Sequence, residues 1–323
     1  MSKSIFSAPH FNNEAAAYAF VEAKIWANGR VCPKCGVVDR SGPLMGKSNR
    51  IGLYKCYACR KPFTVKVGTI FEDSHIQMRD WLTAIHMICA SKKGVSSNQL
   101  HRTLGITLKS AWFMSHRIRE AMKQNGTAPL GGAGEVVEAD ETYFGDLPVH
   151  KAGSKRHGRK HVQRRGPSYK RAILSLVERG GEARSFYVEN APIEKVVEIV
   201  RANVAKESRL HTDESYLYTT VGKEFGAHET IVHSKKEYAR GDVTTNTVEG
   251  FYSIFKRGMI GVYQHCGESH LHRYLAEFDF RYSNRVKLGV DDTARAAKAL
   301  KGIVGKRLTY RRTNERTETP AVW

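Results

Sequence analysis

Three short stretches of the chain each carry one carboxylate in a setting suited to metal-dependent chemistry. EVVEADETYFG has the apolar content of a β-strand with Asp140 at its carboxyl end, and RLHTDES is a second short strand that ends in Asp213. TNTVEGFYSIFKR has the periodicity of a helix and carries Glu249. Carboxylate oxygens are the ligands that Mg²⁺ prefers. Two such ions activate a water or a 3′-OH and stabilise the leaving oxygen of a phosphodiester.

The first of these stretches contains further acids whose positions follow from strand alternation. Glu138 and Asp140 are expected on one face of the strand and Glu141 on the other. A charged residue in an apolar strand costs free energy unless it is paired or binds a metal. The alternative is an exposed acidic cluster at the end of a strand. The two later acidic stretches favour a metal site over that alternative.

The helix that carries Glu249 has one apolar and one polar face. Its apolar stripe is formed by Val248, Phe251, Tyr252, Phe255 and Met259. Glu249 and Lys256 lie off this stripe, two turns apart on one polar face. Asn246 could bind a metal through its amide oxygen, but an anionic ligand neutralises Mg²⁺ better, which favours Glu249. A remaining alternative is that Glu249 lies on the solvent-exposed face of a surface helix and binds no metal.

Two C-x-x-C pairs, CPKC and CYAC, lie near the amino terminus with twenty residues between them. This spacing is typical of a zinc ribbon that holds one structural Zn²⁺. The predicted zinc ligands are Cys32, Cys35, Cys56 and Cys59. Two disulfides would suit a secreted protein, and nothing else in the sequence indicates secretion. Cys89 and Cys266 have no such spacing and are expected to be ordinary buried thiols.

Length and charge set limits on the class of protein. The 323 residues suffice for two or three compact units, and 41% of them are hydrophobic. Lys and Arg number 52 against 32 acidic residues, a net charge of +20 that favours polyanionic partners, although it also fits a merely basic soluble protein. Neither a membrane span of roughly 18 apolar residues nor the apolar core of a signal peptide is found. We therefore expect a cytoplasmic protein without a membrane partner.

Residues 96–122 have the pattern of a helix-turn-helix. A helix over 96–104 is followed by Gly105 and by a helix over 107–122 that Thr107 would cap. The residues of the second helix expected to face inward are Leu108, Ala111, Trp112, Ile118 and Met122. The residues expected to face outward and contact DNA are Lys109, Arg117 and Arg119. The alternative is a plain helical hairpin that joins two domains.

The second half of the chain alternates strands and helices after a glycine-rich linker. Strands at 135–145, 170–179 and 183–189 precede a helix that Pro192 opens, and the Asp213 strand follows. A helical piece, a strand over 229–234 and the Glu249 helix complete the order β-β-β-α-β-α-β-α, which is that of a ribonuclease-H-like fold. The basic run 147–168 is either a solvated loop or a contact to the DNA backbone, and both can hold.

These elements predict an α+β multidomain protein with a mixed sheet in its catalytic domain. The predicted domains are an amino-terminal helix and zinc ribbon (1–70), a helix-turn-helix region (71–126), a ribonuclease-H-like domain (127–290) and a basic carboxy-terminal helix and tail (291–323).

Several longer motifs follow one another in order over nearly the whole chain, from about residue 15 to residue 308. They are CPKC with CYAC, FTVKVGTIFEDSHI, SKKGVSSNQLHRTLGI, AWFMSHRIREAM, ADETYFG, HTDESYLY, NTVEGFYSIFKRG and SHLHRYLAEFDFRY. With these motifs the chain resembles bacterial insertion-sequence transposases of the DDE class, in the ISXO-like branch that has an amino-terminal zinc ribbon. Where that family often has FRYNNR, this chain has FRYSNR, with Ser283 in place of an asparagine.

The resemblance implies roles for individual residues. Asp140, Asp213 and Glu249 would be the catalytic acids that bind two Mg²⁺ or Mn²⁺ ions. Lys256 would be the lysine that follows the third acid, and it would pair with a DNA phosphate as a point charge.

The resemblance also implies a reaction and partners. DNA strands would be cleaved at the ends of an insertion sequence, and the 3′-OH ends would be joined to target DNA. The zinc ribbon and helix-turn-helix would bind the terminal inverted repeats of double-stranded DNA, and joining two ends implies a homodimer or higher synaptic complex. Two alternatives are a DNA-binding regulator with an inactive nuclease-like domain and a structure-specific nuclease without strand transfer. Intact acids at all three positions argue against the regulator.

Overall fold

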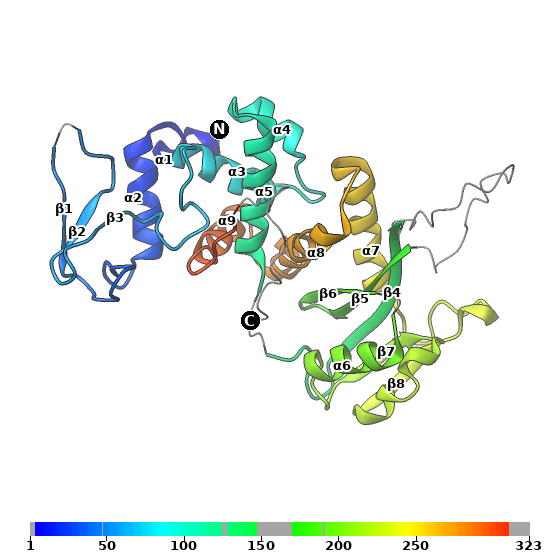
Figure 1. Cartoon of the computed structure of the whole chain (residues 1–323). Coiled ribbons are helices and arrows are strands. Elements are labelled where there is room, and N and C mark those ends of the chain that lie inside the picture. The colour runs from blue at the N-terminus through cyan, green and yellow to red at the C-terminus, as the bar shows by residue number, and fades with distance from the viewer. Residues whose placement is uncertain (1–3, 47, 125–127, 147–169, 190, 310–323) are drawn as a thin grey trace, which may run out of the picture. The chain divides into compact units, whose positions relative to one another are not determined.

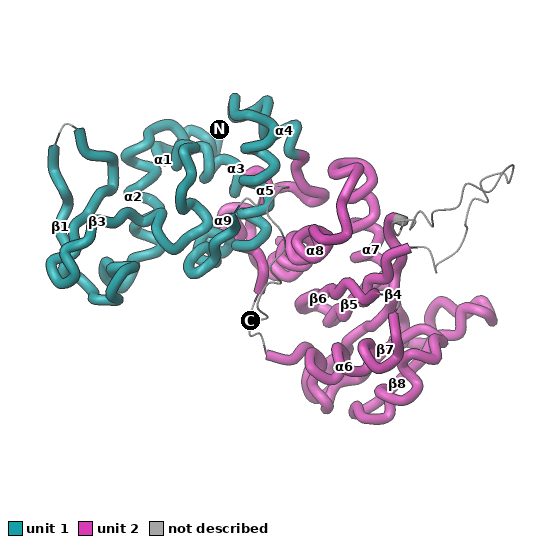
Figure 2. The backbone as a smooth tube through the Cα atoms, viewed as in Figure 1, with its two compact units in different colours: residues 1–85, 97–121, 297–323 teal, residues 86–96, 122–296 magenta. Residues whose placement is uncertain are grey.

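The structure is a computed structural model that describes residues 4–46, 48–124, 128–146, 170–189 and 191–309. The chain divides into two compact units, which Figure 2 shows in different colours. The first unit comprises residues 1–85, 97–121 and 297–323, and the second comprises residues 86–96 and 122–296. Each unit thus combines segments that are far apart in the sequence. The predicted basic run 147–168 lies outside the described residues.

The first unit begins with a 3-10 helix η1 (Ile5–Ser7) and two helices, α1 (Pro9–Asn12) and α2 (Glu14–Ile25). The two helices meet at Asn13, whose side chain accepts a hydrogen bond of 2.9 Å from the backbone N–H of Ala16. Asn13 is therefore the cap of α2.

A small antiparallel sheet follows, with strands β1 (Ser41–Pro43), β2 (Tyr54–Cys56) and β3 (Pro62–Phe63) in the order β1-β2-β3. The buried centre of this sheet contains Phe63 and two of the paired cysteines, with Trp26 and Tyr54 packed against it. The Trp26 ring meets the Tyr54 ring edge-on at a centroid distance of 5.6 Å. Such a core is small, so a bound metal would add substantially to its folding free energy.

Three helices follow the sheet: α3 (Met78–Ala90), α4 (Ser97–Leu104) and α5 (Leu108–Met122). The α4–α5 turn is close to the prediction. Gly105 has φ of +64°, a backbone conformation that favours glycine. The Thr107 side chain accepts a hydrogen bond of 3.1 Å from the backbone N–H of Ser110, which confirms the predicted cap.

The outward-facing side of α5 differs from the prediction. Arg117 is buried, and its guanidinium donates hydrogen bonds of 2.9 Å to the backbone carbonyl of Ile70 and 2.7 Å to that of Glu72. Arg119 is 1% exposed and donates to the Ser115 hydroxyl. The prediction that both arginines face outward is therefore wrong, because a guanidinium that finds buried acceptors can leave the solvent.

The inward-facing residues of α5 also differ in part. Ala111, Ile118 and Met122 are buried as predicted, whereas Leu108 is 45% exposed at the first position of the helix and Trp112 is partly buried. Lys109 is exposed, as predicted.

The second unit is built on a five-stranded sheet with the strand order β6-β5-β4-β7-β8. Its strands are β4 (Val136–Asp146), β5 (Lys170–Glu178), β6 (Ala183–Val188), β7 (Arg209–Asp213) and β8 (Ala227–Ile231). The β4–β5 and β5–β6 pairs are antiparallel, and the β4–β7 and β7–β8 pairs are parallel. The predicted mixed sheet is therefore present, with β4 in the middle.

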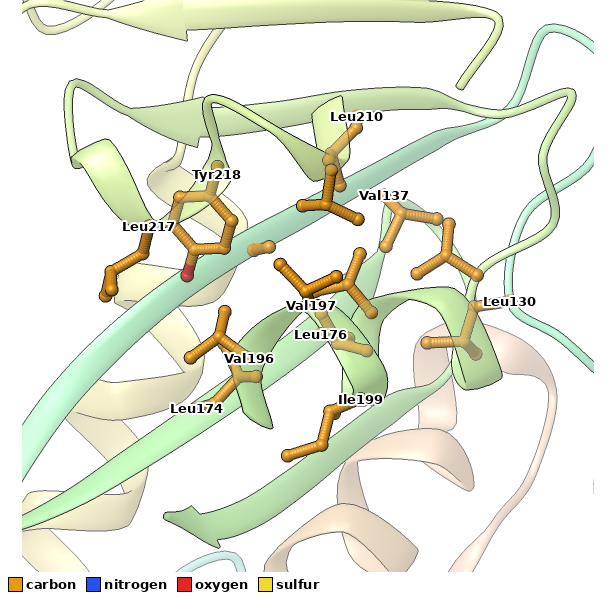
Figure 3. Close-up of a cluster of buried hydrophobic side chains, with 14 of the residues drawn as sticks. Leu130, Val137, Leu174, Leu176, Val196, Val197, Ile199, Leu210, Leu217 and Tyr218 are labelled. Atoms are coloured by element: carbon orange, nitrogen blue, oxygen red, sulfur yellow. The ribbon is translucent and has the colours of Figure 1, made fainter. Parts of the chain in front are cut away.

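Helices cover both faces of this sheet, as Figure 1 shows. One face packs on α6 (Ile193–Asn203), where the apolar cluster of Figure 3 includes Val137, Leu176, Val196 and Leu210. The other face packs on α7 (Asn246–Gly258) and α8 (Glu268–Ser283). All five residues of the predicted apolar stripe of α7 are buried. In α6, Val196 and Val200 are buried, whereas Ile193 in the first turn is 37% exposed.

Short helical turns connect these elements. They are η3 (Tyr216–Tyr218), η4 (Val221–Glu224), η5 (His233–Lys235), the π-helix η6 (Met259–Tyr263) and η7 (Val286–Leu288), and α9 (Asp292–Lys301) follows. Ser283, at the end of α8, accepts a hydrogen bond from the backbone N–H of Ala183 on the edge strand β6. Within the described part of the chain, none of the helices combines the length and the apolar character needed to span a membrane.

Candidate active site and metal centres

Asp140 and Asp213 lie next to each other at the edge where two parallel strands separate. The β4–β7 pairing ends at the pair Ala139 and Thr212, so the next residue of each strand is an aspartate. The prediction that Asp140 lies at the carboxyl end of its strand is wrong, because β4 continues along β5 as far as Asp146. The carboxyl ends of parallel strands are where ligands bind in open sheets, and here that edge presents two acids.

A cavity of about 450 Å³ contains these two acids. It is lined by Asp140, Glu141, Thr142, Asp213, His233, Glu249, Tyr252, Ser253 and Lys256. The strand-borne and helix-borne residues predicted to act together therefore share one cavity. Glu249 lines this cavity, whereas Asn246 is exposed and does not line it.

Glu141 takes part in the acidic cluster although the sequence placed it on the opposite face of the strand. Ligand atoms of Asp140, Glu141 and Asp213 all lie within 4.8 Å of one another. Burial, then the charges of Glu141 and Asp213, raise the pKa of Asp140 to about 8. The charges of carboxylates this close repel one another, and a bound divalent cation would offset that repulsion.

The inner side of Glu141 faces the buried hydroxyl of Tyr218. Burial raises the pKa of Glu141 to about 7, and the Tyr218 hydroxyl lowers it in part. Neither Glu141 Oε1 nor the Tyr218 hydroxyl has a partner at regular hydrogen-bond geometry among the described residues. Tyr218 itself belongs to the apolar cluster under α6 (Figure 3).

Glu249 lies on the wall of the cavity, outside the compact group of three acids. Its side chain is 51% exposed, and its Oε1 accepts a hydrogen bond of 3.1 Å from the Thr245 hydroxyl. The same oxygen lies 3.8 Å from His233 Nε2. Lys256 lies two turns further along α7 and lines the same cavity, so the predicted shared face of the acid and the cation is confirmed.

The position of α7 depends on Glu138, a residue to which the sequence assigned no function. The Glu138 side chain is fully buried, and its Oε2 accepts hydrogen bonds from the backbone N–H groups of Thr247 (2.7 Å) and Val248 (3.0 Å). Its Oε1 accepts from Arg179 Nη2 at 2.8 Å. A carboxylate at the amino terminus of a helix satisfies orphan N–H groups and complements the helix dipole. The sequence feature that could have indicated this role is an acidic residue between the apolar strand residues Val137 and Ala139.

Tyr252 provides the second attachment of α7 to the sheet. Its hydroxyl donates to the backbone carbonyl of Asp140 at 2.5 Å and lies 3.2 Å from that of Ile173. The helix is thus fixed to β4 both at Glu138 and at Asp140, and these contacts set the distance between the strand-borne acids and Glu249.

The first unit contains a separate cluster of four cysteines. Ligand atoms of Cys32, Cys35, Cys56 and Cys59 lie within 4.8 Å of one another. The Cys32–Cys59 and Cys35–Cys56 sulfur pairs are each 3.7 Å apart. A tetrahedral zinc with Zn–S bonds of about 2.3 Å requires sulfur atoms about 3.8 Å apart, so the cluster fits a Zn²⁺ ion. Cys89 and Cys266 are buried outside it, as predicted.

Comparisons with known proteins match both the zinc-ribbon part and the acidic-cavity part of the chain. The family model for the ISXO2-like transposase domain matches residues 130–283, and that for the transposase zinc-ribbon domain matches residues 12–62. A protein from Halobacterium salinarum, described as an uncharacterized protein in transposable element ISH50, is 27% identical over 268 residues. This match covers 79% of the present chain and 86% of the relative. The resemblance inferred from the motifs is therefore confirmed.

Proposed function

Because the chain carries a transposase zinc ribbon and an ISXO2-like transposase domain, we propose that it cleaves DNA at the ends of an insertion sequence and joins the 3′-OH ends to target DNA. One observation carries this proposal. Asp140 and Asp213 from neighbouring strands share a single cavity with Glu249 and Lys256 from α7, inside the matched transposase domain.

The fold of the second unit supports a ribonuclease-H-like assignment. Three antiparallel strands, β4 to β6, are extended by two strands parallel to β4, and helices cover both faces. The elements also follow one another along the chain in the order that the sequence predicted for a ribonuclease-H-like domain, and the strand that carries the first acid, β4, is the central one.

Asp140, Asp213 and Glu249 are the residues that would hold two Mg²⁺ or Mn²⁺ ions. The raised pKa of Asp140 supports this proposal, because buried acids with no compensating cation retain protons. When bound, such ions activate an attacking oxygen and stabilise the leaving oxygen of a phosphodiester. Glu141 is a competitor for the third position because it lies closer to the two aspartates than the sequence indicated.

The other cavity residues have separate tasks in this proposal. The exposed ammonium of Lys256 would pair with a phosphate of the bound strand and hold it against the acids. Glu138 and Tyr252 would fix α7, so that Glu249 and Lys256 stay at a constant distance from β4.

DNA recognition is assigned to the first unit. The zinc ribbon and an α4–α5 helix-turn-helix would bind the terminal inverted repeats, with Lys109 at the exposed start of α5 as one contact. The net charge of +20 supports a polyanionic partner. Joining two ends would require a homodimer or a higher synaptic complex.

A strand-transfer assay tests this function. Full-length protein, Mg²⁺, labelled DNA from candidate element ends and a plasmid target should yield cleaved ends and then labelled plasmid. Asp213→Asn should yield neither product while still binding the ends. Cleavage without joining would favour a structure-specific nuclease, and binding without cleavage by the unaltered protein would favour a regulator.

A further inference from the structure

The second unit contains another cavity, of about 410 Å³, that is separate from the acidic one. Helix α7 contributes to both: Phe251 and Ile254 line this second cavity, whereas Glu249, Ser253 and Lys256 line the acidic cavity. No residue lines both, and all residues that line the second cavity belong to the second unit. The second cavity is therefore a distinct place at which a ligand could bind.

Cationic side chains dominate the charged lining of the second cavity. They are Lys92, Arg281, Arg285, Lys287 and Arg295, and Asp292 is the carboxylate that lines it among the described residues. Asp292 is paired with Arg295, whose Nη1 lies 2.7 Å from its Oδ1. Lys92, Arg285 and Lys287 form no ion pair with a carboxylate of the part of the chain that the structure describes. The cavity thus has an excess of positive charge.

Arg281 is buried in the wall of this cavity with part of its hydrogen-bonding capacity unused. Its side chain is 5% exposed, and its Nη1 donates to the carboxylate of Glu277, one turn earlier on α8. Its Nε and Nη2 have no partner among the described residues. Because a buried N–H without an acceptor costs free energy, such a group generally has a bound ion or water as its partner.

Arg295 shows what an arginine of the same cavity does when its role is structural. Its Nε donates to the carbonyl of Asn284 at 2.7 Å, its Nη1 to that of Cys89 at 2.8 Å and its Nη2 to that of Val290 at 3.2 Å. All three nitrogens of Arg295 therefore have protein acceptors. Arg281 differs in that two of its nitrogens remain available to a ligand.

Aromatic rings complete the lining and orient two of the arginines. Phe251, Phe278 and Tyr282 line the cavity. The Arg281 guanidinium lies over the Phe278 ring at 4.6 Å from its centroid, and that of Arg285 lies over the Tyr282 ring at 4.1 Å. A guanidinium stacked on a ring is already ordered, so it loses less entropy when it binds an anion. The cavity therefore suits an anion that carries an apolar or aromatic group.

We propose that the second cavity binds a phosphate monoester, such as the 5′-phosphate of a mononucleotide or of a DNA strand end. A phosphate monoester has a charge of about −1.5 to −2 at pH 7 and three acceptor oxygens, which match several uncompensated cations better than a single carboxylate does. The volume of about 410 Å³ is that of a small-molecule site. This inference goes beyond the proposed function and does not depend on cleavage at the acidic cavity.

The test measures the binding of adenosine 5′-monophosphate (AMP) to the full-length protein by calorimetry, without divalent metal. AMP should bind more tightly than adenosine, because the phosphate is the group that the cations contact. Lys92→Gln combined with Lys287→Gln removes two exposed cations of the cavity. This double variant should bind AMP roughly 2- to 30-fold more weakly, because each exposed ion pair contributes a factor of about 1.4 to 5.

Lys206→Gln combined with Lys223→Gln is the matched control. It removes the same charge from exposed residues of the second unit that line neither cavity, so its affinity for AMP should be unchanged. Equal binding of AMP and adenosine, or equal losses in the two double variants, would overturn the proposal. A loss in Lys256→Gln but not in the cavity variant would place the phosphate in the acidic cavity and would also overturn it.

Two single-stranded oligonucleotides of one sequence, with a 5′-phosphate or a 5′-hydroxyl, identify the source of the phosphate. The ratio of their affinities reports the end phosphate alone, because the rest of the DNA is identical. A preference for the 5′-phosphate that the cavity variant loses supports a site for DNA strand ends. Equal affinities together with AMP binding support a site for free mononucleotides. Neither measurement involves cleavage, so failure of the proposed function is seen separately in the strand-transfer assay.

Discussion

Glu138 on β4 accepts a hydrogen bond of 2.7 Å from the backbone N–H of Thr247, in the first turn of α7. This contact joins the strand that carries Asp140 to the helix that carries Glu249. Arg179 donates to the same side chain, so all observed partners of the buried Glu138 carboxyl group act as donors.

Glu138→Gln should therefore weaken both the fold and the site. The amide would present a donor to at least one group that now donates to Glu138, which should lower the free energy of unfolding by about 1–3 kcal/mol. The looser α7 should raise the Mg²⁺ concentration needed for half-maximal cleavage. Thermal denaturation and a Mg²⁺ titration of cleavage measure the two effects. Glu135→Gln, at an exposed position on the same segment, is the control and should change neither.

Substitution of Glu249 tests the third acid. Glu249→Gln should abolish cleavage and leave end binding intact, with a loss greater than the roughly 10- to 100-fold typical of groups that only orient metal ligands. Asn246→Ala should be milder, because Asn246 is exposed and does not line the cavity.

Glu141→Gln belongs in the same assay on one labelled end at saturating Mg²⁺. Near-normal cleavage by Glu249→Gln together with an inactive Glu141→Gln would transfer the ligand role to Glu141, the acid within 4.8 Å of Asp140 and Asp213.

The four-cysteine cluster predicts one Zn²⁺ per chain. Cys56→Ser should release the metal and unfold the small β1–β3 sheet, because the metal supplies much of the folding free energy of so small a unit. The transposase domain should keep its own unfolding transition. Elemental analysis and calorimetry measure both effects, with Cys266→Ser as a control that should retain zinc. Native protein without stoichiometric zinc would contradict the prediction.

Two cationic residues of α5, Lys109 and Arg117, should cause different defects when they are replaced. Lys109→Ala should weaken DNA binding and reduce its salt dependence by about one counterion, because Lys109 is exposed. Arg117→Ala should instead lower the melting temperature, because it leaves the buried carbonyls of Ile70 and Glu72 without a donor. Binding isotherms at several salt concentrations and thermal denaturation separate the two effects. A salt dependence unchanged by Lys109→Ala would remove that residue from the DNA contact.

The buried carboxyl group of Asp279, which does not line the acidic cavity, should make the stability of the protein depend on pH. Burial raises its pKa to about 7, and hydrogen bonds from Ser185 only partly oppose that shift. The folded protein therefore keeps a proton on Asp279 that the unfolded chain releases near pH 4. The stability from this carboxyl is complete below about pH 4 and is lost as the pH rises toward 7.

Asp279→Asn should flatten the stability profile between these pH values, because an amide can still accept from the Ser185 backbone N–H that now bonds to the carboxyl. Chemical denaturation at a series of pH values provides the measurement. An equally steep profile in the variant would show that another group is responsible.

Local spacing in the sequence determined a large part of this protein. The two C-x-x-C pairs predicted a four-sulfur cluster because each pair lies within one tight turn. The helical period alone put Glu249 and Lys256 on one face of α7 and its five apolar residues on the other. The first acidic strand was recognisable because its apolar residues lie next to Asp140.

Only the tertiary structure decided which charged residues are exposed and which acids come together. Arg117 is buried because its acceptors are at Ile70 and Glu72, far from α5 in the sequence, and no period within α5 encodes them. Glu138 became the cap of α7 because the folded sheet brings Thr247 to it across more than a hundred residues. Glu141 joined Asp140 and Asp213 because the strands separate at that point, whereas simple alternation placed it on the other face. Periodicity specifies the face of an element, and the packing of distant segments specifies what that face meets.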